Sequence, residues 1–72
     1  MNNLNVAKIQ LNGSSYEINI GTNLNELLNR LKIQKNKVAV EVNGEIIEKN
    51  KYPNLILSKD DQVEIVKFIG GG

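Results

Sequence analysis

The last five residues, Phe68-Ile69-Gly70-Gly71-Gly72, are the stretch of this sequence that points most directly to chemistry. Glycine has no Cβ atom, so consecutive glycines allow a backbone to approach another surface closely. Three extended residues span roughly 10 Å, which is long enough to enter a narrow channel in a second protein. We therefore expect Gly70 and Gly71 to occupy such a channel and the carboxylate of Gly72 to be the reacting group.

A carboxylate becomes reactive toward nucleophiles once one of its oxygens is made a good leaving group. Attack on the α-phosphate of ATP would do this by forming an acyl adenylate, and a persulfide or sulfide could then displace AMP to leave a thiocarboxylate. The chain has no cysteine and no histidine, so no side chain can hold the sulfur. The same absences exclude Ser–His and Cys–His nucleophile pairs and zinc sites built on thiolates or imidazoles.

The composition indicates one small domain without a strong charge preference. A chain of 72 residues buries a single thin core and leaves little room for a deep pocket. Nine basic and eight acidic residues give a net charge of +1, without the basic excess of a nucleic-acid-binding protein. The sequence has no apolar run of membrane-spanning length and no secretion signal at its start, so we expect a cytoplasmic monomer that binds neither membrane nor nucleic acid. Four basic residues are interpreted as scattered and solvated: Arg30, Lys32, Lys35 and Lys37.

Two alternating segments separated by a turn signal predict a β-hairpin. Apolar and polar side chains alternate in residues 6–12 and again in residues 15–20, which is the period of a strand buried on one face. Asn12-Gly13 lies between them, and both residue types tolerate the positive φ of a tight hairpin turn. The side chains expected to face inward are Ala7, Ile9, Leu11, Tyr16, Ile18 and Ile20.

A capping box followed by regularly spaced leucines predicts one helix. Asn23 and Glu26 have the spacing at which each side chain can accept a hydrogen bond from the other's backbone N–H. Leucines then recur at i, i+3, i+4 and i+7, which defines one apolar face over two to three turns. We expect Leu24, Leu27, Leu28 and Leu31 to pack against Ile9, Leu11, Ile18, Val40 and Ile65.

The second half of the chain predicts further strands. Residues 37–42 alternate, Asn43-Gly44 is a second turn signal, and residues 45–48 are sufficient only for a small edge strand. Residues 49–54 indicate a loop or a single helical turn. Residues 62–69 are rich in β-branched side chains and predict a final strand.

The final strand is apolar on both faces, with Val63 and Ile65 on one and Val66 and Phe68 on the other. Such a strand either lies centrally in a sheet or exposes an apolar patch. The order of elements predicts an α+β fold, a mixed sheet of four to five strands with one helix packed across it, in which the first and last strands pair in parallel. This is the ubiquitin-like β-grasp layout, with residues 1–69 as the domain and residues 70–72 as a flexible glycine tail.

The sequence resembles the ThiS family, the sulfur carriers of bacterial thiamin thiazole synthesis. The resemblance rests on residues 23–28, 38–47 and 60–72, of which the last segment is the most specific. Asp61 departs from the family pattern, because the turn there often carries glycine. The resemblance implies a carrier that catalyses nothing itself and binds no cofactor.

The resemblance also implies three partners. An E1-like enzyme would adenylate Gly72 with ATP and Mg²⁺, a cysteine desulfurase would supply persulfide sulfur, and thiazole synthase would receive the thiocarboxylate sulfur. Ordering three glycines in a channel costs backbone entropy that glycine side chains cannot offset. We therefore expect a docking surface beside the tail, formed by Val66, Phe68 and Ile69.

Three alternatives stay open. The first is a MoaD-like sulfur carrier for molybdopterin synthesis, against which the compact length and residues 40–45 favour the thiazole carrier. The second is a ubiquitin-like modifier joined to lysines through Gly72, since the same adenylate feeds both outcomes. The third is a binding module whose tail has no chemical role.

Overall fold

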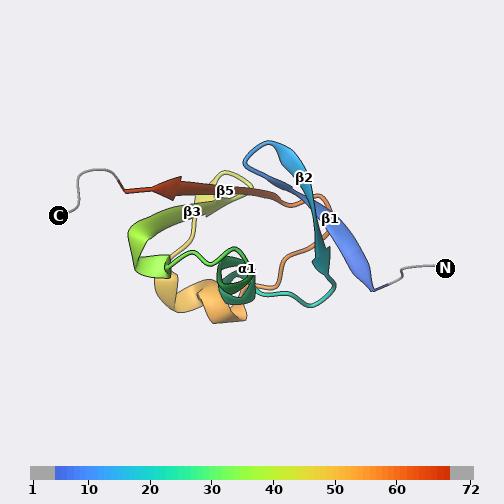
Figure 1. Cartoon of the computed structure of the whole chain (residues 1–72), viewed down its shortest axis with the longest axis horizontal. Coiled ribbons are helices and arrows are strands. Elements are labelled where there is room, and N and C mark those ends of the chain that lie inside the picture. Colours follow the sequence, from blue (N-terminus) through green and yellow to red (C-terminus); the bar gives the residue numbers. More distant parts are fainter. Residues whose placement is uncertain (1–4, 69–72) are drawn as a thin grey trace.

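The computed structural model describes residues 5–68. Five strands in this part of the chain form one sheet in the order β2-β1-β5-β3-β4. The α-helix α1 and the 3₁₀ helix η2 lie on the same side of this sheet (Figure 1). The elements, in chain order, are β1 (Val6–Leu11), β2 (Ser14–Asn19), α1 (Leu24–Arg30), the 3₁₀ helix η1 (Lys35–Lys37), β3 (Val38–Val42), β4 (Glu45–Ile46), η2 (Lys49–Asn54) and β5 (Gln62–Lys67).

The sheet is mixed. β1 pairs in parallel with β5, whereas β2 pairs antiparallel with β1, and β3 pairs antiparallel with both β5 and β4. The chain between β2 and β3 contains α1, and this long connection allows the first and last strands to run in the same direction. The predicted β-grasp architecture is confirmed.

Positive φ angles at two Asn-Gly pairs form the two tight turns that the sequence predicts. Asn12 and Gly13 have φ of 48° and 84°, and Asn43 and Gly44 have φ of 54° and 85°, as a two-residue hairpin turn requires. The prediction for Ile20 is wrong, because its side chain is 63% exposed. β2 ends at Asn19 and the chain turns at Gly21, so Ile20 lies past the point where strand alternation controls side-chain direction.

The predicted capping box begins α1. The Oδ1 atom of Asn23 accepts a hydrogen bond from the N–H of Glu26 at 2.8 Å, and the Oε1 atom of Glu26 accepts one from the N–H of Asn23 at 2.9 Å. These bonds satisfy two backbone donors that the first turn would otherwise leave without partners. The buried residues of the helix are Leu24, Leu27 and Leu28, and its C-cap, Leu31, is half-buried.

The core lies between the sheet and the two helices beneath it. Ile9, Ile18 and Val40 are buried in it together with Leu24, Leu27 and Leu28, and the half-buried Leu11, Leu31 and Ile65 pack against it, so the leucine face and its predicted neighbours share one core. The pattern of residues 49–54 did not indicate a further member, Tyr52 of η2, which is fully buried. The remaining buried residues are Val38, Val42, Leu57 and Val63.

Candidate functional site

The C-terminal half of β5 projects beyond the β1–β2 hairpin. The β1–β5 register covers only Gln62 and Val63 of β5, whereas the β3–β5 register continues to Lys67. In Figure 1, β5 extends away from the hairpin with β3 alone beside its far end. The last residues of β5 thus lie at one end of the described part of the molecule.

The side chain of Asn12 ends the parallel pairing of β5. The backbone N–H of Asn12 donates to the carbonyl of Val63 at 2.9 Å. Its side chain then accepts from the N–H of Ile65 at 2.7 Å and donates to the carbonyl of Ile65 at 3.2 Å. The side-chain amide of Asn12 offers one N–H donor and one carbonyl acceptor, as a backbone peptide unit does. It therefore pairs with Ile65 in place of a further residue of β1.

A second asparagine holds the beginning of β5. Asn43 exchanges two hydrogen bonds with the backbone of Gln62, accepting at 2.9 Å and donating at 2.7 Å. Its Nδ2 atom also donates to the carboxylate of Asp61 at 3.0 Å, and that carboxylate accepts from the N–H of Ser58 at 2.7 Å. The positive φ of this turn is at Asp60, at 70°. Asp61 thus stabilises the turn through its side chain, and the turn forms without glycine.

The residues predicted to dock a partner lie at the projecting end of β5. Val66 is 56% exposed and Phe68 is 59% exposed, so neither belongs to the core. The N–H of Phe68 donates to the carbonyl of Lys37 at 3.0 Å, and the ammonium of Lys49 lies 5.4 Å from the centre of the phenyl ring, within cation–π range. Ile69, Gly70, Gly71 and Gly72 lie outside the described residues, and the docking role stays a prediction.

A surface hollow adjoins Phe68, and we call it the β5-end hollow. Its lining combines apolar residues with three lysines, and no carboxylate is among its lining residues. The lining residues are Leu31, Lys32, Ile33, Gln34, Lys37, Val38, Lys67 and Phe68.

The gathering of lysines in this hollow is not evident from the linear sequence. Lys32 and Lys37 were interpreted as scattered solvated residues, yet the fold places both beside Lys67. The alternation of β5 could have indicated the position of Lys67. Side chains of a strand alternate between its faces, so Lys67 lies on the same face as Val63 and Ile65, which packs toward the helices. A charged residue at that position indicates that the strand has passed the edge of the core.

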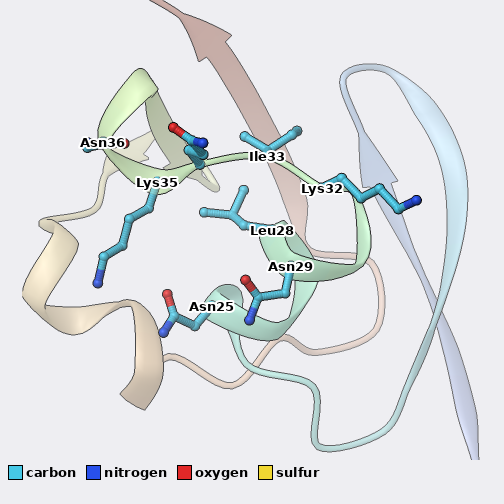
Figure 2. A pocket seen from close by; sticks show the side chains of 8 residues that line it. Asn25, Leu28, Asn29, Lys32, Ile33, Lys35 and Asn36 are labelled. Carbon is cyan, nitrogen blue, oxygen red and sulfur yellow. The ribbon is translucent and has the colours of Figure 1, made fainter.

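A second hollow lies between α1 and η1. Figure 2 shows Asn25 and Asn29 of α1 and Lys35 of η1 bordering the same space, with Leu28 and Ile33 behind them. Its lining residues carry amide, ammonium and apolar groups but no carboxylate, hydroxyl or imidazole. It therefore lacks the pairing of nucleophile and base that side-chain catalysis uses.

The remaining titratable feature of note is the phenol of Tyr52. Burial raises the pKa of this group above its ordinary value of 10.0, and the backbone of Val40 offsets part of the rise. Within residues 5–68, no three acidic, histidine or cysteine side chains are grouped as metal ligands. No helix in that range has the length and apolar character needed to cross a membrane.

A mixed five-stranded sheet crossed by one helix, in a sequence whose last strand is followed by three glycines, defines a ubiquitin-like β-grasp protein. The family model described as the ThiS family matches residues 9–72, and the chain belongs to this family. The chain is 39% identical over 66 residues to the sulfur carrier protein ThiS of Bacillus subtilis (strain 168). The aligned residues cover 89% of this chain and 98% of that protein.

Two further likenesses extend this comparison. The crystal structure of the thiamine biosynthesis protein ThiS from Geobacter metallireducens superposes with a TM-score of 0.79 at 34% identity, over 90% of this chain and 99% of that one. A thiazole synthase of Magnetococcus marinus is 45% identical over 65 residues, which cover 90% of this chain but 20% of that protein. The chain thus spans about a fifth of the length of that relative.

Proposed function

We propose that this chain is a sulfur carrier of thiamin biosynthesis that works through the carboxylate of Gly72. The observation that supports this most strongly is the projection of β5 beyond its hairpin, with exposed Val66 and Phe68 leading into the terminal glycines. A domain built in this way offers its chain end to a partner without unfolding any part of the core.

The proposed reaction begins with activation by an E1-like enzyme that uses ATP and Mg²⁺. A carboxylate oxygen of Gly72 attacks the α-phosphorus, pyrophosphate leaves, and an acyl adenylate forms. Persulfide sulfur from a cysteine desulfurase then displaces AMP to give an acyl disulfide, which a thiol reduces to the thiocarboxylate. The carrier supplies the acyl group and catalyses no step, and it holds no cofactor of its own.

Thiazole synthase is the proposed acceptor of the sulfur. Two proteins named thiazole synthase, from Magnetococcus marinus and Paramagnetospirillum magneticum, contain stretches that are 45% and 38% identical to 65 residues of this chain. This likeness supports the thiazole pathway over molybdopterin synthesis. We also propose a cytoplasmic location, as the sequence leads us to expect.

The exposed end of β5 has an energetic role in this proposal. Ordering Gly70 to Gly72 in a partner's channel costs roughly 3–6 kcal/mol of backbone entropy. Val66 and Phe68 are exposed in the carrier, and covering them on docking releases water from apolar surface and offsets part of that cost. The carrier is therefore recognised as a folded domain together with its tail.

A genetic experiment with chemical analysis tests the proposed function. Deletion of the gene should create a growth requirement for thiamin or its thiazole moiety, and a gene lacking the Gly72 codon should fail to remove it. Molybdenum-cofactor enzymes should keep their activity in the deletion strain. Growth without thiamin, or recovery of the chain from cells mainly as lysine-linked conjugates, would contradict the proposal.

A further inference from the structure

We propose that the β5-end hollow is an electrostatic recognition site for an acidic surface on the activating enzyme. This inference rests on the proposed function, and it adds the charge of the surface that the carrier seeks. It is based on three lysines, Lys32, Lys37 and Lys67, which line this hollow together with apolar residues that include Phe68.

The lysines come from three different segments that the fold brings together. Lys32 follows α1 in a left-handed conformation with φ of 60°, which turns the chain back toward the sheet. Lys37 ends η1, and its carbonyl accepts from the N–H of Phe68 at 3.0 Å. Lys67 lies opposite Val38 in the β3–β5 register. The backbone thus holds the Cα atoms of these three lysines at defined positions near Phe68.

Within residues 5–68, these ammonium groups have no carboxylate partner. The ion pair formed in that range joins Lys51 and Glu48 at 3.6 Å, and it includes none of the three lysines. A fourth lysine, Lys49, lies over the ring of Phe68 rather than against an acidic group. The lysines are therefore available to carboxylates of another protein.

The charges of this nearly neutral protein are separated along β5. Glu41 and Glu64 face each other across the β3–β5 pair, and Asp60 and Asp61 precede the strand with the single lysine Lys59 beside them, whereas Lys67 lies at its far end. A net charge of +1 thus conceals a positive end where the tail begins. Such an asymmetry orients a protein as it approaches an oppositely charged partner and increases the association rate.

The length of the tail determines which protein meets this surface. Four residues follow Phe68, and when extended they reach roughly 14 Å, so an enzyme that binds Gly72 in its active site must approach to about that distance from Phe68. At that distance the enzyme lies close to the β5-end hollow, because Phe68 is one of its lining residues. An acidic protein surface fits better than a nucleic acid, because Leu31 and Ile33 line the same hollow as the lysines and favour apolar contact beside the charges.

The test compares two double charge reversals that change net charge equally. Lys37→Glu/Lys67→Glu alters the hollow, and Lys8→Glu/Lys59→Glu alters exposed lysines on β1 and in the turn before β5. Both variants are checked for folding by circular dichroism. The apparent KM for the carrier and kcat are then measured as ATP-dependent pyrophosphate release by the E1-like enzyme of the same organism, at low and high salt.

We expect the hollow variant to raise KM by roughly tenfold at low salt with kcat unchanged, and the control to change KM by less than about twofold. High salt should reduce the difference, because the Debye length falls from about 10 Å at 0.1 M to about 3 Å at 1 M. Equal KM values for the two variants, a salt-independent difference or a loss confined to kcat would overturn the inference alone. If the wild-type chain is not activated at all, the proposed function fails as well.

Discussion

Asn12 and Ile65, 53 residues apart in the sequence, are joined by two hydrogen bonds between one side chain and one backbone unit. The pair closes the parallel half of the sheet and marks the residue after which β5 continues with β3 alone. Asn12 also forms the hairpin turn at φ of 48°. A single residue therefore sets both the hairpin and the point from which the tail-bearing end projects.

Replacing Asn12 with glycine should destabilise the fold by about 1–2 kcal/mol, because it removes both hydrogen bonds to Ile65 and keeps a residue suited to positive φ. Asn12→Asp is the matched control, since its carboxylate can still accept from the Ile65 N–H but cannot donate to the carbonyl. Urea denaturation should rank wild type above Asp and Asp above Gly. Equal midpoints for wild type and Asn12→Gly would show that the two hydrogen bonds between Asn12 and Ile65 contribute nothing to stability.

Leu27 should be among the most sensitive core positions. Its side chain is fully buried, so Leu27→Ala should cost about 2–5 kcal/mol through lost burial and the cavity left behind. Ile46→Ala is a suitable control, because Ile46 is 70% exposed on β4 and should change stability by less than about 0.5 kcal/mol. The placement of the helix would be wrong if both variants unfolded at the same urea concentration as wild type.

Tyr52 should make stability fall at alkaline pH. Because its pKa is raised above 10.0 in the folded state, the neutral phenol contributes stability that is fully present below pH 10.0 and is lost as the pH rises through the folded pKa. Its hydroxyl has no hydrogen-bond partner of good geometry among the described residues. Tyr52→Phe should therefore change stability by less than about 1 kcal/mol near neutral pH and lose less stability above pH 10.0. Parallel alkaline profiles for the two proteins would contradict this account.

Phe68→Ala should weaken activation without unfolding the domain. The ring is 59% exposed, and covering that surface on docking contributes about 1–2 kcal/mol, which corresponds to a roughly 5- to 30-fold rise in apparent KM. Ile20→Ala removes a side chain of similar exposure at the far end of β2 and should leave KM unchanged. A large loss of thermal stability for Phe68→Ala would instead assign Phe68 a structural role.

Most of the fold could be predicted because local signals and tertiary packing agree. The Asn12-Gly13 turn, the Asn23–Glu26 capping box and the leucine spacing each describe contacts within a few residues. Ile20 was mistaken because strand alternation was continued past the end of β2, where Gly21 turns the chain at φ of 95°. Tyr52 was missed because a 3₁₀ helix is too short to show an amphipathic period.

The site could be predicted only in part. The glycines are adjacent in sequence, so the residue types alone indicate the chemistry. The β5-end hollow depends instead on the fold, which brings Lys32, Lys37 and Lys67 to the lining of one hollow although their spacing in the sequence carries no periodic signal. The hydrogen bonds between the side chain of Asn12 and Ile65 also join residues far apart in the sequence. They were not predicted, since Asn12 was expected to form the hairpin turn alone.

The most direct test of the account is an intact-mass measurement after reaction. The wild-type chain and a variant lacking Gly71 and Gly72 are incubated with ATP, Mg²⁺, the E1-like enzyme, a cysteine desulfurase and cysteine. The buried core lies within the described residues, so both proteins should show the same circular dichroism spectrum. Wild type should gain one oxygen-to-sulfur exchange, with alkylatable sulfur in its final peptide, and the variant should gain none. Sulfur located elsewhere, sulfur on the shortened chain, or an unchanged wild-type mass would contradict the claim that Gly72 carries the sulfur.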